Sequence, residues 1–184
     1  MKNVLYSVLF VMCALPALHA QVFATGTAKT SFYSTARLEN IEATSKKTTA
    51  VINTATNQVL FKILISSFVF KNGLMQEHFN ETYMESDKYP YAQFEGKINE
   101  HIDYTVEGEY PVTVTGTLLV HGVEVVRTIS GKVKVSAGSV TLSADFVVNA
   151  SAHKIDIPKD KISNIAQDIK VSVYATCIPY VAKK

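Results

Sequence analysis

The amino-acid sequence predicts an all-β protein, an antiparallel β-barrel of about eight strands with one short amphipathic helix. Two observations lead to this fold class. Apolar and polar residues alternate with a period of two along most of the chain, and a helical period occurs at one place, near residues 74–83. A sheet with one apolar side needs a cover that a single helix cannot supply. Closure of the sheet into a barrel buries that side and leaves no free edge.

The strand candidates follow one another with short turns between them. Turns that contain Gly or Asn fall at 54–58, 71–73, 121–122 and 137–138. Tight turns join strands that are neighbours in a sheet, so the three strands between 110 and 149 are expected to form a meander. The predicted strands span Thr27–Ser34, Leu38–Ser45, Thr49–Ile52, Gln58–Phe70, Ala92–Asn99, Tyr110–His121, Val123–Ser136, Ser139–Asn149 and Asp168–Ile178.

The helix candidate lies between the fourth and the fifth predicted strand. Leu74, Met75, Phe79 and Tyr83 recur at helical spacing, whereas the segments on either side alternate like strands. A single helix inserted between two strands of a barrel is expected to cap one end of it.

Residues 1–20 have the pattern of a secretory signal peptide. A lysine precedes an almost wholly apolar run at 4–15, and small residues before Gln21 offer a cleavage site. Cys13 follows Val and Met rather than the small residues of a lipoprotein signal, so lipidation is not expected. We therefore expect a mature domain at 21–184, periplasmic in a cell with two membranes and otherwise secreted.

The composition indicates one nearly neutral domain. Lys and Arg number 18 against 16 Asp and Glu, a formal net charge of +2, which gives no electrostatic reason for nucleic-acid binding. Without the signal peptide Cys177 remains as a single thiol, so no intramolecular disulfide can form. Its place in an alternating run predicts a small buried hydrophobe. No linker, charge block or internal repeat divides the chain.

The meander indicates what the barrel interior contains. A barrel of about eight strands encloses a space that side chains fill or that holds one small ligand. The expected inner faces carry Val, Ala and Gly with scattered Phe, and the chain has no Trp. These small residues favour an empty space, but a closely packed β-sandwich would give the same alternation. The inner faces of the first and third meander strands carry Val112, Val114, Gly116, Leu118, Val120, Val140, Leu142, Ala144, Phe146 and Val148.

Three blocks of the sequence resemble the YceI-like family, whose members are lipocalin-like barrels associated with polyisoprenoid lipids. The second block is the Val-Thr-Gly-Thr-Leu-Leu-Val-His-Gly-Val run at 114–123, and the third joins Phe146 to the Ile-Asp-Ile-Pro run at 155–158. The resemblance extends over nearly all of 21–184. The first block consists of Phe68, Asn72, Met75, His78, Phe79, Tyr83, Tyr89-Pro90, Phe94 and Gly96.

Two loops depart from the family pattern. Glu124-Val125 stands where many members have Thr-Lys, and the run from Ser151 to Lys154 replaces a common Asp-Tyr-Gly. These differences leave the barrel pattern intact. We assign no binding role to these two loops.

The resemblance implies that the protein holds a polyisoprenoid-type lipid, or an isoprenoid quinone, in a hydrophobic tunnel for carriage or storage. An enclosed apolar channel can bind such a chain without a dedicated polar site, because each buried CH₂ contributes about 0.8 kcal/mol. Met75, Phe79 and Tyr83 are expected to form a lid. The residues expected to line the tunnel or its lid are Phe61, Ile63, Ile65, Phe68, Phe70, Met75, Phe79, Tyr83, Phe94, Val114, Leu118, Val120, Leu142, Ala144, Phe146 and Val148.

The same residues also fit a protein of a different class. Phe and Val that alternate on strands pack a core in most proteins, and the barrel could be filled and serve a structural or interaction role in the cell envelope. In that case the exposed tyrosines Tyr89, Tyr91 and Tyr180 would contact another protein. A cavity of several hundred Å³ would favour the lipid carrier. The sequence leaves the oligomeric state open.

Neither a metal site nor an active site is expected. His78 and Glu81 have a spacing that can bind a metal on one helix face, but His101, His121 and His153 add no ligand-like spacing. The chain has no nucleophile elbow, no metalloprotease motif and no glycine-rich phosphate loop. We expect a non-enzymatic protein with no cofactor other than a bound lipid or quinone, and with no stable membrane anchor.

Overall fold

The computed structural model describes residues 22–35, 40–157 and 166–180. The predicted signal peptide at 1–20 lies outside these residues. Nine strands, one α-helix and three short helical turns follow one another along the described chain. Their bounds are β1 Val22–Ser34, β2 Ile41–Asn53, β3 Gln58–Leu64, η1 Ile65–Ser67, β4 Val69–Phe70, α1 Gly73–His78, η2 Phe79–Tyr83, β5 Tyr91–Ile98, β6 Gly108–Val120, β7 Val123–Ser136, β8 Ser139–Asn149, η3 Ser151–His153 and β9 Asp168–Pro179.

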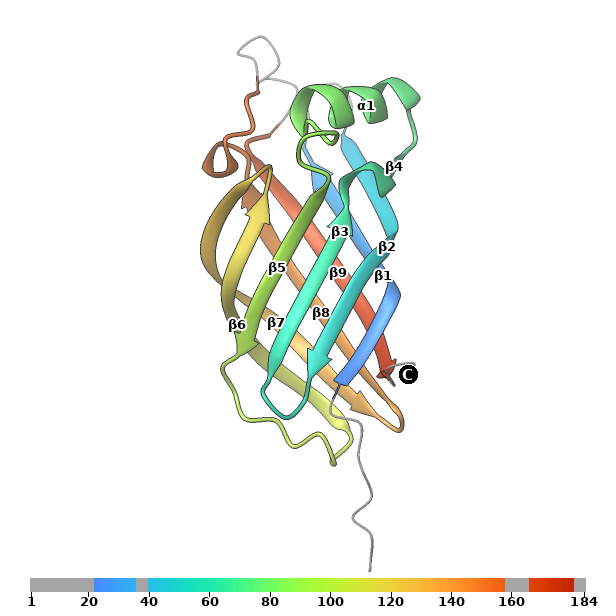
Figure 1. Ribbon diagram of the computed structural model, residues 1–184, viewed down its shortest axis with the longest axis vertical. Coiled ribbons are helices and arrows are strands. Elements are labelled where there is room, and N and C mark those ends of the chain that lie inside the picture. Colours follow the sequence, from blue (N-terminus) through green and yellow to red (C-terminus); the bar gives the residue numbers. More distant parts are fainter. Residues whose placement is uncertain (1–21, 36–39, 158–165, 181–184) are drawn as a thin grey trace, which may run out of the picture.

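The strands form a closed antiparallel barrel, as the sequence predicts. The sheet order is β1-β9-β8-β7-β6-β5-β3-β2, and β1 pairs with β2 to close the ring. The short strand β4 pairs with the same edge of β2 as β3 does, farther along that strand, through Ala43↔Phe70 and Thr44↔Val69. Figure 1 shows the strands crossing the long axis at a steep tilt, with α1 across the upper end. The predicted meander is the β6–β7–β8 succession.

One long strand replaces the predicted strands Leu38–Ser45 and Thr49–Ile52. In β2, Lys46 and Lys47 together face the single residue Lys29 of β1, because the pairs Thr30↔Ser45 and Ala28↔Thr48 flank them. This β-bulge inserts one extra residue and shifts the alternation, so that Ser45 and Thr48 are both buried. This shift in the alternation explains why the sequence predicts two strands where the structure has one.

The predicted strand Gln58–Phe70 is instead broken after residue 64. The hydroxyl of Ser67 lies 2.6 Å from the carbonyl oxygen of Leu64 and 2.7 Å from Ser45 Oγ. The amide of Ile65 donates to the carbonyl of Pro90 at 2.9 Å. These bonds stabilise the η1 turn, which separates β3 from β4, and both strands pair with β2.

The predicted helix is confirmed, and it continues into a wider turn. Asn72 caps α1, since its side-chain oxygen accepts hydrogen bonds from the amides of Leu74 and Met75 at 2.9 and 3.4 Å. After His78 the chain continues as a π-helical turn, η2, to Tyr83. We call residues 73–83 the lid.

The end of the barrel away from the lid is packed with side chains. Small and branched residues from β1, β2, β3, β5, β6, β7, β8 and β9 meet there, and Ile52, Val133 and Cys177 are at most 1% exposed. Burial raises the pKa of the Cys177 thiol to about 11, so the group stays protonated and behaves as the apolar side chain expected from the sequence. The buried members are Ala28, Ala50, Ile52, Val59, Ile98, Ile102, Val112, Val133, Val135, Val140, Leu142, Ala175 and Cys177.

Candidate functional site

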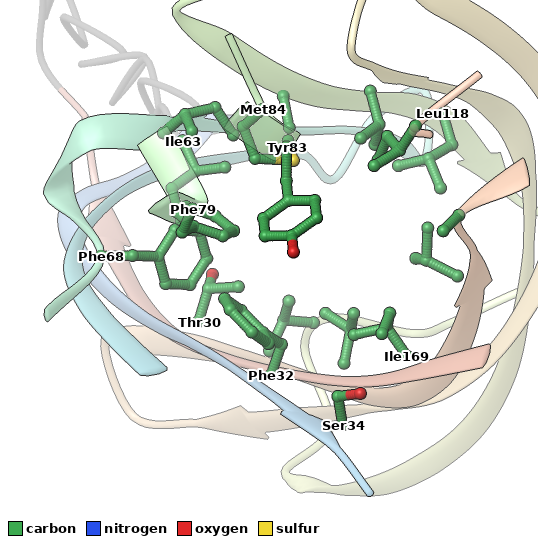
Figure 2. Close-up of a pocket in the computed structure, with 18 of the residues that line it drawn as sticks. Thr30, Phe32, Ser34, Ile63, Phe68, Phe79, Tyr83, Met84, Leu118 and Ile169 are labelled. Atoms are coloured by element: carbon green, nitrogen blue, oxygen red, sulfur yellow. The ribbon is translucent and has the colours of Figure 1, made fainter. Parts of the chain in front are cut away.

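A cavity of about 490 Å³ lies inside the barrel between the lid and the packed end. Its wall comes from the upper parts of the strands, from η1 and from the lid, and Figure 2 shows side chains projecting from these elements into a common space. The packed core at the other end contributes no buried residue to the wall. The hollow therefore occupies one half of the barrel and ends where the packed core begins.

Most residues that the sequence assigned to a tunnel lie around this cavity. They come from β3, β4, β5, β6 and β8, from the segment between β3 and β4, and from the lid. Alternation identified those on strands, and helical spacing identified those of the lid. The predicted residues found in the wall are Phe61, Ile63, Ile65, Phe68, Phe70, Met75, Phe79, Tyr83, Phe94, Leu118, Val120, Phe146 and Val148.

Val114, Leu142 and Ala144 do not line the cavity, which corrects their predicted place in the wall. Leu142 is 5% exposed within the packed core, and Val114 packs against that core. Ala144 pairs with Gly131 of β7. These residues point inward as expected, but they lie too far from the lid. At their level of the barrel, side chains from opposite strands pack against one another.

Several wall residues were missed by the sequence reasoning. They come mainly from β1, from β9 and from the segment after β8, and they include a second set of apolar residues at alternate positions. Ile169, Val171 and Val173 show a period of two in β9 that would have identified them. The missed residues are Thr30, Phe32, Ser34, Ile41, Thr48, Lys62, His78, Met84, Ala92, Gln93, Ala150, Ile155, Ile157, Ile169, Val171 and Val173.

An aromatic cluster holds the lid against the wall. Phe79 of the lid stacks on Phe32 of β1 with ring centroids 5.3 Å apart. It also contacts Phe68 and Phe70 with centroids 5.7 and 5.0 Å away. Offset and edge-on pairs of this kind contribute about 0.5–1.5 kcal/mol each beyond area burial. Phe79 therefore serves both as the lid's anchor and as part of the cavity wall.

Two histidines connect the η3 turn to the β6–β7 turn. His153 of η3 is 1% exposed, and its Nδ1 lies 3.1 Å from the carbonyl oxygen of Val123. Burial lowers the pKa of His153, so the neutral imidazole is favoured. The carbonyl oxygen of His153 in turn lies 3.3 Å from Nδ1 of His121, in the β6–β7 turn.

Most of the cavity wall is apolar, and hydroxyl groups are among its few polar members. Thr30 Oγ1 of β1 and Thr48 Oγ1 of β2 lie 2.8 Å apart and are hydrogen-bonded to each other. Ser34 is 1% exposed, and its hydroxyl accepts a hydrogen bond from the amide of Ala166 at 3.1 Å. Figure 2 shows the hydroxyl of Tyr83 directed into the open space. Such a wall suits a mainly apolar ligand.

The described residues contain no group of three His, Cys, Asp or Glu side chains that could hold a metal ion. His78 belongs to the cavity wall at the exposed surface of the lid. Within the described part of the chain, no helix is long and apolar enough to span a membrane.

A model of the YceI-like domain matches residues 17–177. The chain belongs to the YceI-like family. This confirms the resemblance found in the three sequence blocks. No curated protein matches the chain.

Solved structures share the YceI-like fold at low sequence identity. A polyisoprenoid binding domain from Saccharophagus degradans, implicated in plant cell wall breakdown, superposes with a TM-score of 0.74 at 14% identity, covering 88% of this chain and 100% of that domain. BcnA of Burkholderia cenocepacia has a TM-score of 0.68 at 17% identity, covering 82% and 95%. The YceI protein of Campylobacter jejuni has 0.65 at 20%, covering 80% and 90%. At these identities the likeness establishes the fold.

Proposed function

We propose that this protein is an exported lipid-binding protein that holds a polyisoprenoid-type lipid, an isoprenoid quinone included, for carriage or storage. The observation that carries the proposal is the apolar cavity of about 490 Å³ under the lid. Its volume is in the range of small-molecule binding sites, about 300–1,000 Å³. The polyisoprenoid binding domain of Saccharophagus degradans has the same fold.

The chemistry of the wall supports a hydrocarbon ligand. Phe, Ile, Leu, Val and Met side chains make up most of it. An isoprenoid tail offers no groups for hydrogen bonds, so its affinity comes from removal of apolar surface from water, about 0.8 kcal/mol for each buried CH₂. Two methionines of the wall, Met75 in the lid and Met84 directly after it, adapt to tails of varied shape because the thioether chain is flexible.

The alternative of a filled interaction barrel has less support. It required a filled interior, whereas the half of the barrel beneath the lid encloses the cavity of about 490 Å³. Of the three tyrosines proposed for a partner surface, Tyr91 and Tyr180 are 44% and 59% exposed. Tyr89 instead packs edge-on against His121 with centroids 4.5 Å apart.

Lipid extraction tests the proposal directly. The protein is purified from its native host under mild conditions, and the organic extract is analysed by mass spectrometry. A prenyl-chain lipid at near-stoichiometric amount is the expected result. Repeated absence of any lipid would argue for the filled-barrel alternative.

Cavity-filling variants locate the binding space. Ala92→Trp and Val171→Trp place an indole in the cavity from opposite parts of the wall, and each should abolish lipid recovery. Val126→Trp is the matched control, because Val126 is 74% exposed on the outer face. Circular dichroism verifies that each variant is folded. Full lipid content in both cavity variants would place the ligand elsewhere.

Export rests on the sequence of residues 1–20 and is part of the same proposal. Fractionation of the native host, together with N-terminal sequencing of the mature protein, tests it. A mature chain that begins at Gln21 outside the cytoplasm is expected. An intact Met1 in the cytoplasmic fraction would refute export without affecting lipid binding.

A further inference from the structure

Tyr83 brings a hydroxyl into a cavity that is otherwise mainly hydrocarbon. The residue ends the η2 turn of the lid, and Figure 2 shows its side chain reaching from the lid toward the middle of the space, with the oxygen at its tip. No other described residue forms a hydrogen bond with this hydroxyl. A tyrosine that is closed over by a ligand needs a hydrogen-bond partner for its O–H group. A ligand in the cavity is positioned to provide this hydrogen-bond partner.

A second polar feature lies on the same cavity wall. Thr30 and Thr48 are 6% and 2% exposed, and their hydroxyls are 2.8 Å apart. The β2 bulge after Ser45 is what turns Thr48 inward, opposite Ala28 and beside Thr30. A hydroxyl has one proton and two lone pairs, so a bonded pair keeps one O–H proton to donate and further lone pairs to accept. Both features offer neutral hydrogen bonds and no charge.

The described wall holds no enclosed cation that would favour an anionic group. Lys62 contributes to the wall, but its ammonium lies 4.1 Å from the ring centre of Tyr91, which is exposed on β5. Arg127 of β7 does not line the cavity, but its guanidinium lies 5.9 Å from the ring centre of the wall residue Phe146. This guanidinium is already bonded, because Nη1 donates to the carbonyl of Val147 at 2.5 Å. His78 stands at the exposed surface of the lid. A buried diphosphate would therefore lose its hydration without a countercharge.

We propose that Tyr83 is a specificity-determining residue that selects prenyl lipids by an uncharged oxygen-bearing end held inside the barrel. The inference rests on the proposed lipid-binding function and adds which end of the lipid is enclosed. A carbonyl oxygen, such as that of a quinone ring, accepts the hydrogen bond of the Tyr83 hydroxyl. The Thr30–Thr48 pair provides a second polar contact for the same end. A site built to hydrogen-bond a ligand group discriminates against analogues that lack it.

Three probes with the same geranylgeranyl tail test the inference: a benzoquinone, a diphosphate and the tail hydrocarbon alone. Binding to the delipidated full-length mature protein is measured by displacement of a fluorescent fatty acid. The benzoquinone should bind the wild-type protein more tightly than either of the other probes. Tyr83→Phe should weaken the benzoquinone by about 3- to 10-fold, the effect of one neutral hydrogen bond, and leave the hydrocarbon unchanged.

Two further variants separate specificity from folding. Tyr91→Phe removes a hydroxyl from the outer face and should leave all three affinities unchanged. Thr48→Val removes one member of the hydroxyl pair with little change in shape, and it should also weaken the benzoquinone selectively. Equal benzoquinone affinity in the wild-type and Tyr83→Phe proteins, or a preference for the diphosphate, would overturn the inference while lipid binding stands. Failure of every probe to bind the wild-type protein would overturn the proposed function itself.

Discussion

Nε2 of His121 lies 2.8 Å from Oε2 of Glu85, and this pair joins the end of the lid to the β6–β7 turn. Both residues have positive φ angles, 43° at Glu85 and 50° at His121. Positive φ is uncommon for residues other than Gly, Asn, Asp and His, so the backbone at Glu85 is in a strained conformation that the surrounding contacts must hold. Lys88 lies 3.8 Å from the other carboxylate oxygen of Glu85. The pair fixes the end of the lid opposite its phenylalanine anchor.

Replacement of Glu85 by Gln should loosen the lid with little loss of global stability. The Glu85 side chain is 43% exposed, so the lost charge interaction costs at most about 1 kcal/mol. Hydrogen exchange across residues 73–83 should become faster, and bound lipid should dissociate faster. Glu81→Gln on the same turn is the control, because Glu81 is exposed to solvent. Equal exchange rates in the two variants would show that the contact between Glu85 and His121 does not restrain the lid.

Stability should fall as the pH drops below the ordinary pKa of histidine, near 6.5. Burial lowers the pKa of His153 from 6.5, so the folded protein resists protonation at this site. Below this value the unfolded chain binds a proton that the folded chain excludes, and the free energy of unfolding decreases until the folded pKa is passed. Urea denaturation between pH 8 and pH 5 measures the slope.

The matched comparison for this pH effect is His153→Gln, which removes the titrating group and keeps an amide donor for the carbonyl of Val123. Its stability should be lower than that of the wild-type protein at pH 8, and the difference between the two should narrow toward pH 5. Parallel curves over the whole range would assign the pH dependence to another group.

The two halves of the barrel should respond differently to the same substitution. Ile52 is fully buried in the packed end, whereas Ile63 is 8% exposed on the cavity wall. Ile52→Ala should cost about 2–5 kcal/mol in unfolding free energy and leave lipid affinity unchanged. Ile63→Ala should cost less, because its side chain already lacks neighbours on the cavity side, and it should alter lipid affinity. Similar stability losses and unchanged binding in both would contradict the division into two halves.

A close backbone approach between β5 and β6 should make Gly116 intolerant of a side chain. Gly96 and Gly116 face each other in the pair, and a Cβ on Gly116 would overlap the carbonyl oxygen of Glu95. Gly116→Ala should destabilise the protein by about 1–3 kcal/mol through overpacking. Gly26→Ala is the control, since nothing lies within 4 Å of an added Cβ there. Thermal unfolding of both variants measures the contrast, and equal midpoints would refute the steric explanation.

Much of the barrel could be predicted because side-chain alternation is a local property. Strands β6, β7 and β8 differ from their predicted bounds by at most two residues. The errors occurred where local pattern and tertiary pairing differ: the bulge at Lys46 and Lys47 changed the period, and the η1 turn ended β3 although apolar residues continued to Phe70. Neither feature is visible without knowing which strand lies opposite.

The sequence could predict which side chains point into the barrel, but not whether each lies at the level of the cavity or of the packed core. Leu142 and Val148 share the inner face of β8, yet Leu142 packs in the core and Val148 lines the hollow. The difference depends on how closely the opposite wall approaches at each level of the barrel. The hydroxyl pair Thr30–Thr48 was also missed, because threonines on strands are common and their contact joins residues from two strands across a bulge.

Because one half of the barrel is packed, the hollow is closed at that end. A lipid that binds there enters and leaves by the same opening beside the lid, so the portion that enters first leaves last. A tail longer than the hollow leaves its remainder outside, where water makes it unfavourable. If the protein carries lipid as proposed, a membrane or an acceptor protein would meet that trailing portion first, and transfer would begin there while the inner end is still held.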